Sequence, residues 1–175
     1  QGLHLHRPEL GAFCRSLERT LGHPAQVNAY YTPRSAQGLP VHHDTHDVFV
    51  LQVSGEKRWL VYEPALELPL RNQKYTAEMG GPGEPVHDLV LRPGDMLYLP
   101  RGWLHEALTS DSDSLHLTFG VNVVTWLDAF NAALEECGDE LGFRRSAGDG
   151  DADELVDSLR SRLTTDAVER RAAEK

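Results

Sequence analysis

The feature that most constrains the fold of this 175-residue chain is a long series of short apolar runs between Gln26 and Val124, which Pro, Gly and Asp interrupt repeatedly. Each run has the length of a β-strand, and no segment of helical periodicity separates them. Many short strands at close spacing favour an antiparallel sandwich or barrel. We therefore predict a mainly β fold, with strands near residues 26–32, 46–53, 58–63, 87–92, 95–99, 105–109 and 114–124.

Helical periodicity is confined to the two ends of the chain. Pro8 can begin a first helix and Gly22 can end it. After Thr125 the helical spacing returns and continues toward the C-terminus. We predict a β core over residues 1–125 and a helical segment over residues 126–175.

The C-terminal segment carries a narrow apolar stripe on an otherwise charged helix, formed by Leu155, Leu159 and Leu163. Such a stripe can pack on the body of the protein or on a second subunit, so a homodimer through this segment is a hypothesis. The last residues, 169–175, are expected to fray.

Composition excludes some classes of function. The formal net charge is −10, and the acidic residues are spread along the chain, which is a poor basis for direct nucleic-acid binding. No stretch is apolar enough to cross a membrane. Cys14 and Cys137 lie in helix-like stretches and are expected to be core thiols, which favours a reducing, cytoplasmic location. Because the chain opens on Gln1 and not on Met, we expect the natural protein to begin earlier.

Histidines are the most informative residues, and several crowd into the segment from His42 to Asp47. On an extended chain, side chains two residues apart share one face, so His42 and Asp44 can bind one ion together. A third ligand must come from a distant strand. His105 is the best candidate, because it follows a strand and the tight turn Pro100–Gly102.

Two imidazoles and one carboxylate leave about three coordination positions open on a metal. A non-haem Fe(II) oxygenase needs that many, whereas a zinc hydrolase needs fewer and a structural zinc site needs none. The alternative is that the His-x-Asp sequence arises by chance in a histidine-rich surface loop. The second motif, ending at His105, favours the metal site.

Four segments together resemble the JmjC-type cupin oxygenases, and within them the ribosomal-protein hydroxylases of the histidyl hydroxylase type. These segments are Asn28–Pro33 with Gln37-Gly38, His42-x-Asp44 leading into Asp47–Gln52, Gly55–Trp59, and Pro100–His105 followed by Leu115–Thr118. The resemblance covers roughly residues 1–130. It implies a double-stranded β-helix, the cupin or jelly-roll fold of JmjC type, with an N-terminal helix and C-terminal helices.

The resemblance also implies a chemistry. Fe(II) would be bound by His42, Asp44 and His105, and O₂ would be reduced as 2-oxoglutarate is oxidatively decarboxylated and a C–H bond is hydroxylated. Lys57 matches the family lysine that binds the far carboxylate of 2-oxoglutarate, although by itself it reads as a solvated hairpin lysine. Asn28 matches a position beside the cosubstrate, and Tyr30 is expected to line the same cavity.

The substrate implied by the resemblance is a side chain of a protein, in particular a basic ribosomal protein. A small-molecule 2-oxoglutarate oxygenase and a non-catalytic, metal-binding cupin remain alternatives, while a histone demethylase shares the fold but less of the motif likeness. The chain departs from the family at Phe119-Gly120-Val121, where members often carry a Ser-Thr pair. Family members also possess a C-terminal winged-helix domain, which does not follow within these 175 residues, so we expect either that it has been removed or that this is a minimal member.

Overall fold

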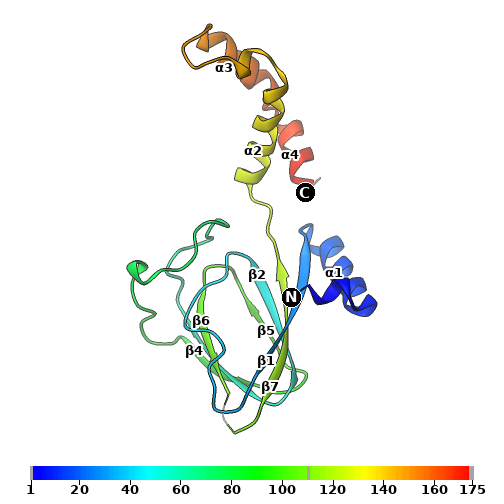
Figure 1. The fold of residues 1–175 in the computed structure, drawn as a ribbon, viewed down its shortest axis with the longest axis vertical. Helices are drawn as coiled ribbons and strands as arrows, with labels where there is room; N and C mark the ends of the chain where they lie inside the picture. Colours follow the sequence, from blue (N-terminus) through cyan, green and yellow to red (C-terminus); the bar gives the residue numbers. More distant parts are fainter. Residues whose placement is uncertain (1, 110, 174–175) are drawn as a thin grey trace. The chain divides into compact units, whose positions relative to one another are not determined.

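The chain divides into two compact units, Gln1–Val123 and Val124–Lys175. The structure, a computed structural model, describes residues 2–109 and 111–173. The first unit contains all the β-strands of this described part together with helix α1, and the second unit contains the remaining α-helices (Figure 1).

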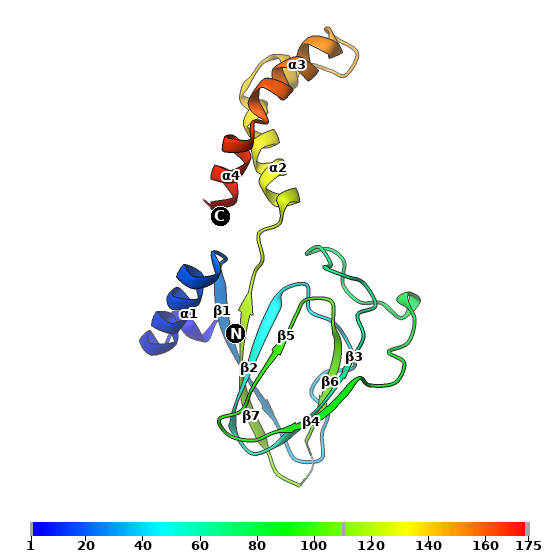
Figure 2. The ribbon, with the colours of Figure 1, turned by 180° about the vertical axis from the view of Figure 1, so that it is seen from behind.

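Two antiparallel sheets face each other in the first unit (Figures 1 and 2). The four-stranded sheet has the order β1-β7-β2-β5, and the three-stranded sheet has the order β4-β3-β6. The strands are β1 (Ala25–Thr32), β2 (Asp47–Ser54), β3 (Lys57–Tyr62), β4 (His87–Leu91), β5 (Met96–Leu99), β6 (Leu104–Leu108) and β7 (Ser114–Val121). The predicted mainly β fold is confirmed, and the strand positions differ from prediction only at their ends.

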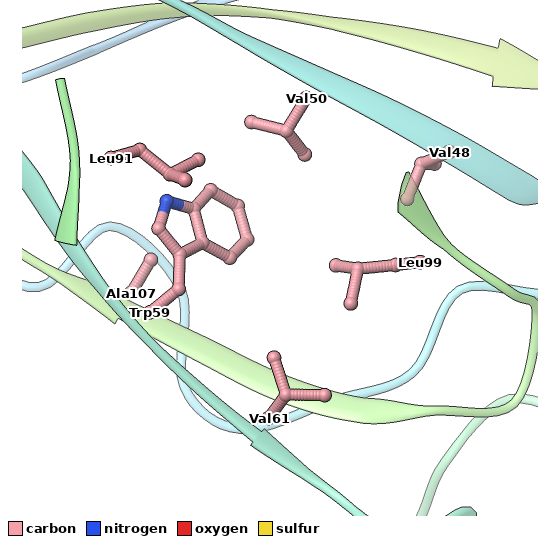
Figure 3. Close-up of a cluster of buried hydrophobic side chains, with 7 residues drawn as sticks. All are labelled: Val48, Val50, Trp59, Val61, Leu91, Leu99 and Ala107. Atoms are coloured by element: carbon pink, nitrogen blue, oxygen red, sulfur yellow. The ribbon is translucent and has the colours of Figure 1, made fainter. Parts of the chain in front are cut away.

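The space between the sheets is filled by side chains that alternate along each strand. In β2, Val48 and Val50 point inward and are buried, while Phe49 between them faces the other side. Trp59 of β3 lies among aliphatic side chains contributed by both sheets (Figure 3). The indole is 5% exposed, and truncating a buried aromatic side chain of this kind costs roughly 3–5 kcal/mol. This cluster holds the two sheets together.

Helix α1 (Pro8–Leu21) covers the outer face of the four-stranded sheet. It begins at Pro8 and ends at Gly22, whose φ of 73° lies in the left-handed region, as the sequence predicts. Cys14 is buried against Val27 and Phe119, and the ring of Phe13 meets that of Phe119 at 4.9 Å between centroids. The helix thus anchors β1 and β7, the two strands that carry one wall of the barrel.

Two irregular segments complete the first unit. Between β1 and β2, residues 37–42 form two isolated bridges with β6, Gln37 with Leu108 and His42 with His105. Between β3 and β4, the chain forms a long loop that is interrupted by one short 3-10 helix, η2 (Ala77–Met79). In Figure 1 this loop extends to the side of the strands.

The second unit contains α2 (Trp126–Glu136), the 3-10 turns η3 (Cys137–Asp139) and η4 (Gly142–Arg144), α3 (Ala152–Arg162) and α4 (Thr165–Ala173). Helix α2 begins with a capping box between Thr125 and Asp128. Within the described residues, no helix combines the length and the apolar character needed to cross a bilayer.

Small residues of α2 and η3 lie in the core of the second unit. Ala129, Ala133 and Cys137 are buried, as is Val168 of α4. Both cysteines of the chain are free and buried, which confirms them as core thiols. The prediction that residues 169–175 fray is wrong for 169–173, because α4 packs on α2 and continues to Ala173; residues 174–175 lie outside the described part.

Candidate metal centre and adjoining cavity

The backbones of His42 and His105 pair directly in an isolated antiparallel bridge. The N–H of His42 donates to the carbonyl of His105 at 3.1 Å, and the N–H of His105 donates to the carbonyl of His42 at 2.8 Å. Such a closely paired bridge places the two side chains on the same face. Their imidazole centroids are accordingly 4.4 Å apart, although the residues are far apart in sequence.

The hydrogen bonds of these imidazoles fix which nitrogen is available to a metal. Nδ1 of His42 lies 2.8 Å from the carbonyl oxygen of Pro40, and Nδ1 of His105 lies 3.0 Å from that of Trp103. A carbonyl oxygen only accepts, so each Nδ1 carries a proton and Nε2 is the ring nitrogen left to bind a metal. Backbone acceptors of this kind orient histidine ligands in metal sites.

Asp44 completes a three-residue cluster. One ligand atom from each of His42, Asp44 and His105 lies within 4.8 Å of the other two. The carboxylate Oδ2 of Asp44 is 3.9 Å from Nε2 of His105, a separation that leaves space for an ion between them. Two imidazoles and a carboxylate form the donor set of a 2-His-1-carboxylate centre with open positions. The residues therefore fit a divalent, oxygenase-type metal.

Burial keeps the His105 imidazole in the form that binds metal. Burial, followed by the neighbouring His42, lowers the pKa of His105 to about 4, although the hydrogen bond to the Trp103 carbonyl and the charge of Asp44 act in the opposite direction. At neutral pH the ring is therefore uncharged, and its Nε2 lone pair is free to bind a cation without first losing a proton.

The two histidines beside these ligands have other contacts. His43, between His42 and Asp44, is buried and hydrogen-bonds through Nε2 to the carbonyl of Gln73, at 2.9 Å. His46 lies against Gly120, where an added Cβ would come within 2.8 Å of the imidazole. His43 thus joins the long β3–β4 loop to the metal-binding segment, whereas His46 packs on β7.

The turn before β6 also contacts the metal-binding segment. The N–H of Gly102 donates to the carbonyl of Asp44 at 3.0 Å. Gly102 has a φ of 91°, and an added Cβ would overlap the carbonyl oxygen of Leu66 and lie 2.9 Å from Cδ of Pro69. Only glycine fits this position, so the Pro100–Gly102 motif brings together the Asp44 backbone, the β3–β4 loop and the start of β6.

A cavity of about 210 Å³ lies between the sheets and is lined by all three cluster residues. Its volume corresponds to roughly seven water molecules at about 30 Å³ each, which suits a small organic acid. Val48, Val50 and Ala107 supply apolar walls. The polar residues of its lining, besides the three cluster residues, are Tyr30, Tyr31, Thr32, Lys57, His116 and Thr118.

Lys57 is a buried cation in this cavity. It is 3% exposed, and its Nζ donates to Oγ1 of Thr32 at 2.9 Å. Burial alone lowers the pKa of Lys57 to about 8. Among the contacts of the described residues, no carboxylate is paired with this ammonium, and a buried cation without a counter-charge is costly. The site is therefore suited to receive an anion, and the reading of Lys57 as a solvated hairpin residue does not hold.

Tyr30 and Asn28 lie on β1, two residues apart. Tyr30 lines the cavity, and burial followed by the charge of Asp44 raises the pKa of its phenol. Asn28 is not among the lining residues; its Oδ1 accepts a hydrogen bond from the N–H of Gly2 at 2.8 Å. In this structure Asn28 therefore tethers the N-terminal segment.

Thr32 and Thr118 line the cavity but were not singled out from the sequence. Thr32 could have been found, because it shares the inward face of β1 with Tyr30 at a spacing of two. His116 faces Tyr30 across the β1–β7 pair, and this register is visible only in the folded sheet. Nδ1 of His116 is buried without a hydrogen-bond partner among the described residues.

Solved structures resemble the whole fold. The Escherichia coli ribosomal oxygenase YcfD covers 98% of this chain with a TM-score of 0.63 at 18% sequence identity, and this chain covers 48% of that protein. A structure of YcfD in complex with cobalt and 2-oxoglutarate gives a TM-score of 0.64 at 20% identity, with the same coverage. At such identities the likeness establishes the fold, and it confirms the double-stranded β-helix with terminal helices.

Several curated proteins are similar in sequence. The bifunctional lysine-specific demethylase and histidyl-hydroxylase NO66 of Drosophila persimilis is 44% identical over 111 residues, which are 63% of this chain and 16% of that protein. Ribosomal oxygenase 1 of Homo sapiens is 41% identical over 146 residues, 76% of this chain and 22% of that protein. The chain thus spans less than a quarter of the length of each of these two relatives.

The family model described as JmjC domain matches residues 6–129, which include every strand of the first unit and all three residues of the metal cluster. This match extends over more than half of the chain and agrees with the sequence resemblance. The chain therefore belongs to the JmjC domain family.

Proposed function

We propose that this chain is the catalytic part of an Fe(II)- and 2-oxoglutarate-dependent oxygenase that hydroxylates a side chain of a protein substrate. The observation that carries the proposal is one cavity with two chemically different ends. His42, Asp44 and His105 supply an open metal site, and Lys57 supplies a buried cation in the same cavity. A 2-oxo diacid needs both, one end to chelate a metal and one end to meet a positive charge.

The division of labour among the residues follows from their contacts. His42 and His105 would bind Fe(II) through Nε2, held in orientation by the carbonyls of Pro40 and Trp103. Asp44 would add one carboxylate oxygen and neutralise part of the charge. When bound, the iron with O₂ and 2-oxoglutarate would supply the oxidising power for C–H hydroxylation.

Other residues would bind and orient the cosubstrate. Lys57 would pair with the far carboxylate, with Thr32 holding its Nζ in place. The apolar walls at Val48 and Val50 would keep water away from the acid, which strengthens the ion pair with Lys57. Tyr30, which lines the cavity, would contact the bound acid. A role for Asn28 beside the cosubstrate stays a prediction.

A ribosomal protein is the substrate we propose. The support is the likeness to proteins named ribosomal oxygenase 1 and ribosomal oxygenase 2. The chain's formal net charge of −10 would favour a basic partner. The test is mass spectrometry of ribosomal-protein peptides after incubation with the enzyme, in which a hydroxylated peptide gains the mass of one oxygen atom.

The activity itself is tested without a known substrate. Succinate formation from 2-oxoglutarate under air with added Fe(II) is measured for the parent chain, His42→Ala and Lys57→Ala. We expect turnover in the parent, none in His42→Ala, and a raised 2-oxoglutarate requirement in Lys57→Ala. Stoichiometric iron binding without any succinate would favour a non-catalytic, metal-binding cupin.

Domain roles and assembly are further proposals. We assign catalysis to the first unit, and the cytoplasmic location stays a prediction that the free cysteines favour. A homodimer through Leu155, Leu159 and Leu163 also stays a prediction, but all three side chains are half-buried, and Leu155 lies close against Gly142 within its own unit. Light scattering that gives the mass of a monomer at micromolar concentration would rule the dimer out.

A further inference from the structure

His116 lies on β7 with its imidazole inside the barrel. Its backbone pairs with Tyr30 of β1 on one side and with Gln52 of β2 on the other. The side chain is 4% exposed and lines the same cavity as Lys57 and the metal cluster. Because strands flank it on both sides, the position of His116 does not depend on a loop.

Two aromatic rings fix the plane of this imidazole. The ring of Tyr30 stacks on it at 5.1 Å between centroids and an angle of 7°. The indole of Trp59 meets it edge-on at 5.5 Å and 76°. Ring contacts of this kind orient the imidazole, but they give neither ring nitrogen a hydrogen-bond partner.

The surroundings of the two ring nitrogens decide where the proton lies. Nδ1 of His116 is buried and has no partner among the described residues. A buried N–H without an acceptor is rarer and costlier than a buried lone pair without a donor. The favoured tautomer therefore has the proton on Nε2. Burial, followed by the charge of Lys57, lowers the pKa of His116 to about 3, so the ring is neutral and has a single N–H.

Lys57 has donor capacity to spare in this cavity. An ammonium carries three N–H donors, and within the described residues Nζ of Lys57 donates one hydrogen bond, to Oγ1 of Thr32. A carboxylate offers two oxygens and about four acceptor sites, more than one ammonium fills. A second donor beside Lys57 that carries no charge would complete the carboxylate's hydrogen bonds without repelling the ammonium.

We propose that His116 donates its ring N–H to the carboxylate that Lys57 binds, and that it thereby selects a diacid long enough to span from the metal to this end of the cavity. The inference rests on the proposed function and adds a cosubstrate-binding residue to it. A purely structural His116 would fill space under Tyr30 and beside Trp59 and would make no distinction between acids.

Binding measurements separate these two roles. The affinities of 2-oxoglutarate and oxalate are measured by titration calorimetry on the Mn(II)-loaded protein, for the parent, His116→Phe and His116→Gln. Oxalate chelates a metal but has no arm to reach Lys57. Phenylalanine keeps the aromatic packing and removes the N–H, whereas glutamine keeps an N–H donor. His6→Phe, at an exposed histidine, is the matched control.

We expect His116→Phe to bind 2-oxoglutarate about 10- to 100-fold more weakly, the effect of losing one hydrogen bond to a charged group. Oxalate affinity should stay within about twofold, since measured contributions vary by that much with context. His116→Gln should recover part of the loss, and His6→Phe should match the parent.

Two results would overturn the inference while leaving the proposed function intact. One is an unchanged 2-oxoglutarate affinity in His116→Phe. The other is an equal loss of 2-oxoglutarate and oxalate binding, which would place the damage at the metal end or in the fold. Failure of the parent protein itself to bind 2-oxoglutarate would overturn the proposed function, and this inference with it.

Discussion

The backbones of His42 and His105 exchange two hydrogen bonds, of 3.1 and 2.8 Å, so that residues far apart in sequence present their imidazoles 4.4 Å apart. This bridge is the structural basis of the proposed metal centre. It depends on backbone atoms, so the two ligands keep their separation even when no side chain of either residue is bonded to a metal.

Lys57→Met should weaken 2-oxoglutarate binding. It should also abolish the fall in 2-oxoglutarate affinity that we expect in the parent protein at alkaline pH. The folded-state pKa of Lys57 is about 8, below its ordinary 10.5, so the ammonium loses its proton as the pH rises through about 8. The parent should therefore bind 2-oxoglutarate more weakly at a pH of about 9 than at about 7.

Titration of the Mn(II)-loaded protein at these two pH values is the measurement. At neutral pH we expect Lys57→Met to bind about 10- to 100-fold more weakly than the parent. Oxalate is the control for changes at the metal end. An equally steep alkaline decline in Lys57→Met would mean that another group causes it.

Gly102→Ala should be considerably more destabilising than Gly94→Ala. Both glycines have a φ in the left-handed region, 91° and 96°, so alanine strains both by about 1 kcal/mol or more. Only at Gly102 would the new Cβ overlap the carbonyl of Leu66; at Gly94 nothing lies within 4 Å. Steric overlap with backbone costs roughly another 1–3 kcal/mol.

Urea unfolding of the two variants and the parent measures this difference. Gly94→Ala serves as the control for strain alone. Equal losses of unfolding free energy in the two variants would show that the turn at Gly102 can shift away from the β3–β4 loop and accommodate the new Cβ without further loss of stability.

His43→Ala should loosen the β3–β4 loop near Gln73. The hydrogen bond from Nε2 of His43 to the carbonyl of Gln73 joins the loop to the metal-binding segment. Losing about 1 kcal/mol of local stabilisation should speed amide exchange in the surrounding loop several-fold. Hydrogen–deuterium exchange with peptide resolution checks this, with the exposed His6→Ala as control. Unchanged exchange would mean that other contacts hold the loop.

The stability of the metal-free protein should depend on pH through His116. Its folded-state pKa of about 3 lies below its ordinary 6.5, so between these values the unfolded chain binds a proton that the folded chain does not. The unfolding free energy contributed by this residue is therefore lost as the pH falls through that window, by up to about 1.4 kcal/mol per pH unit. Above a pH of about 6.5 the contribution is constant.

His116→Phe has no group that titrates in this range. Its unfolding free energy should fall less steeply between pH values of about 6 and 4, with the slope reduced by about 1.4 kcal/mol per unit. Urea denaturation of both proteins across these pH values is the measurement. Identical slopes would show that the folded protein takes up the His116 proton near the ordinary pKa of 6.5, as the unfolded chain does.

Local patterns were sufficient to predict most of the fold. The start of α1 at Pro8 and its end at Gly22 follow from the residues themselves, as do the alternating runs of β2 and β7. The segment from residue 37 to 42 was not recognised as strand-like, because only its ends meet β6 and it has no alternating pattern of its own. The helical character of residues 169–173 was also missed, since it depends on packing between α4 and α2.

The parts of the candidate site that depend on the spacing of residues within a sequence motif could be predicted. The parts that depend on which residues of two paired strands lie opposite each other could not. His42 and Asp44 share a motif, and the motif around His105 supplies a third ligand, so the cluster could be proposed from the sequence. The burial of Lys57 could not, because hairpin lysines are ordinarily solvated and only the resemblance suggested otherwise. The contact between His116 and Tyr30 needs the pairing of β1 with β7, which local sequence does not encode.

The most direct test of the central proposal is anaerobic absorption spectroscopy of the Fe(II)-loaded protein. A 2-oxo acid that chelates Fe(II) through its carboxylate and keto oxygens gives a visible charge-transfer band, which requires two adjacent open positions on the metal. We predict that this band develops on addition of 2-oxoglutarate to the parent protein with a single iron per chain, and that Asp44→Ala abolishes it. Stoichiometric iron binding without the band, or a band that persists in Asp44→Ala, would contradict the assignment of His42, Asp44 and His105 as an open oxygenase centre.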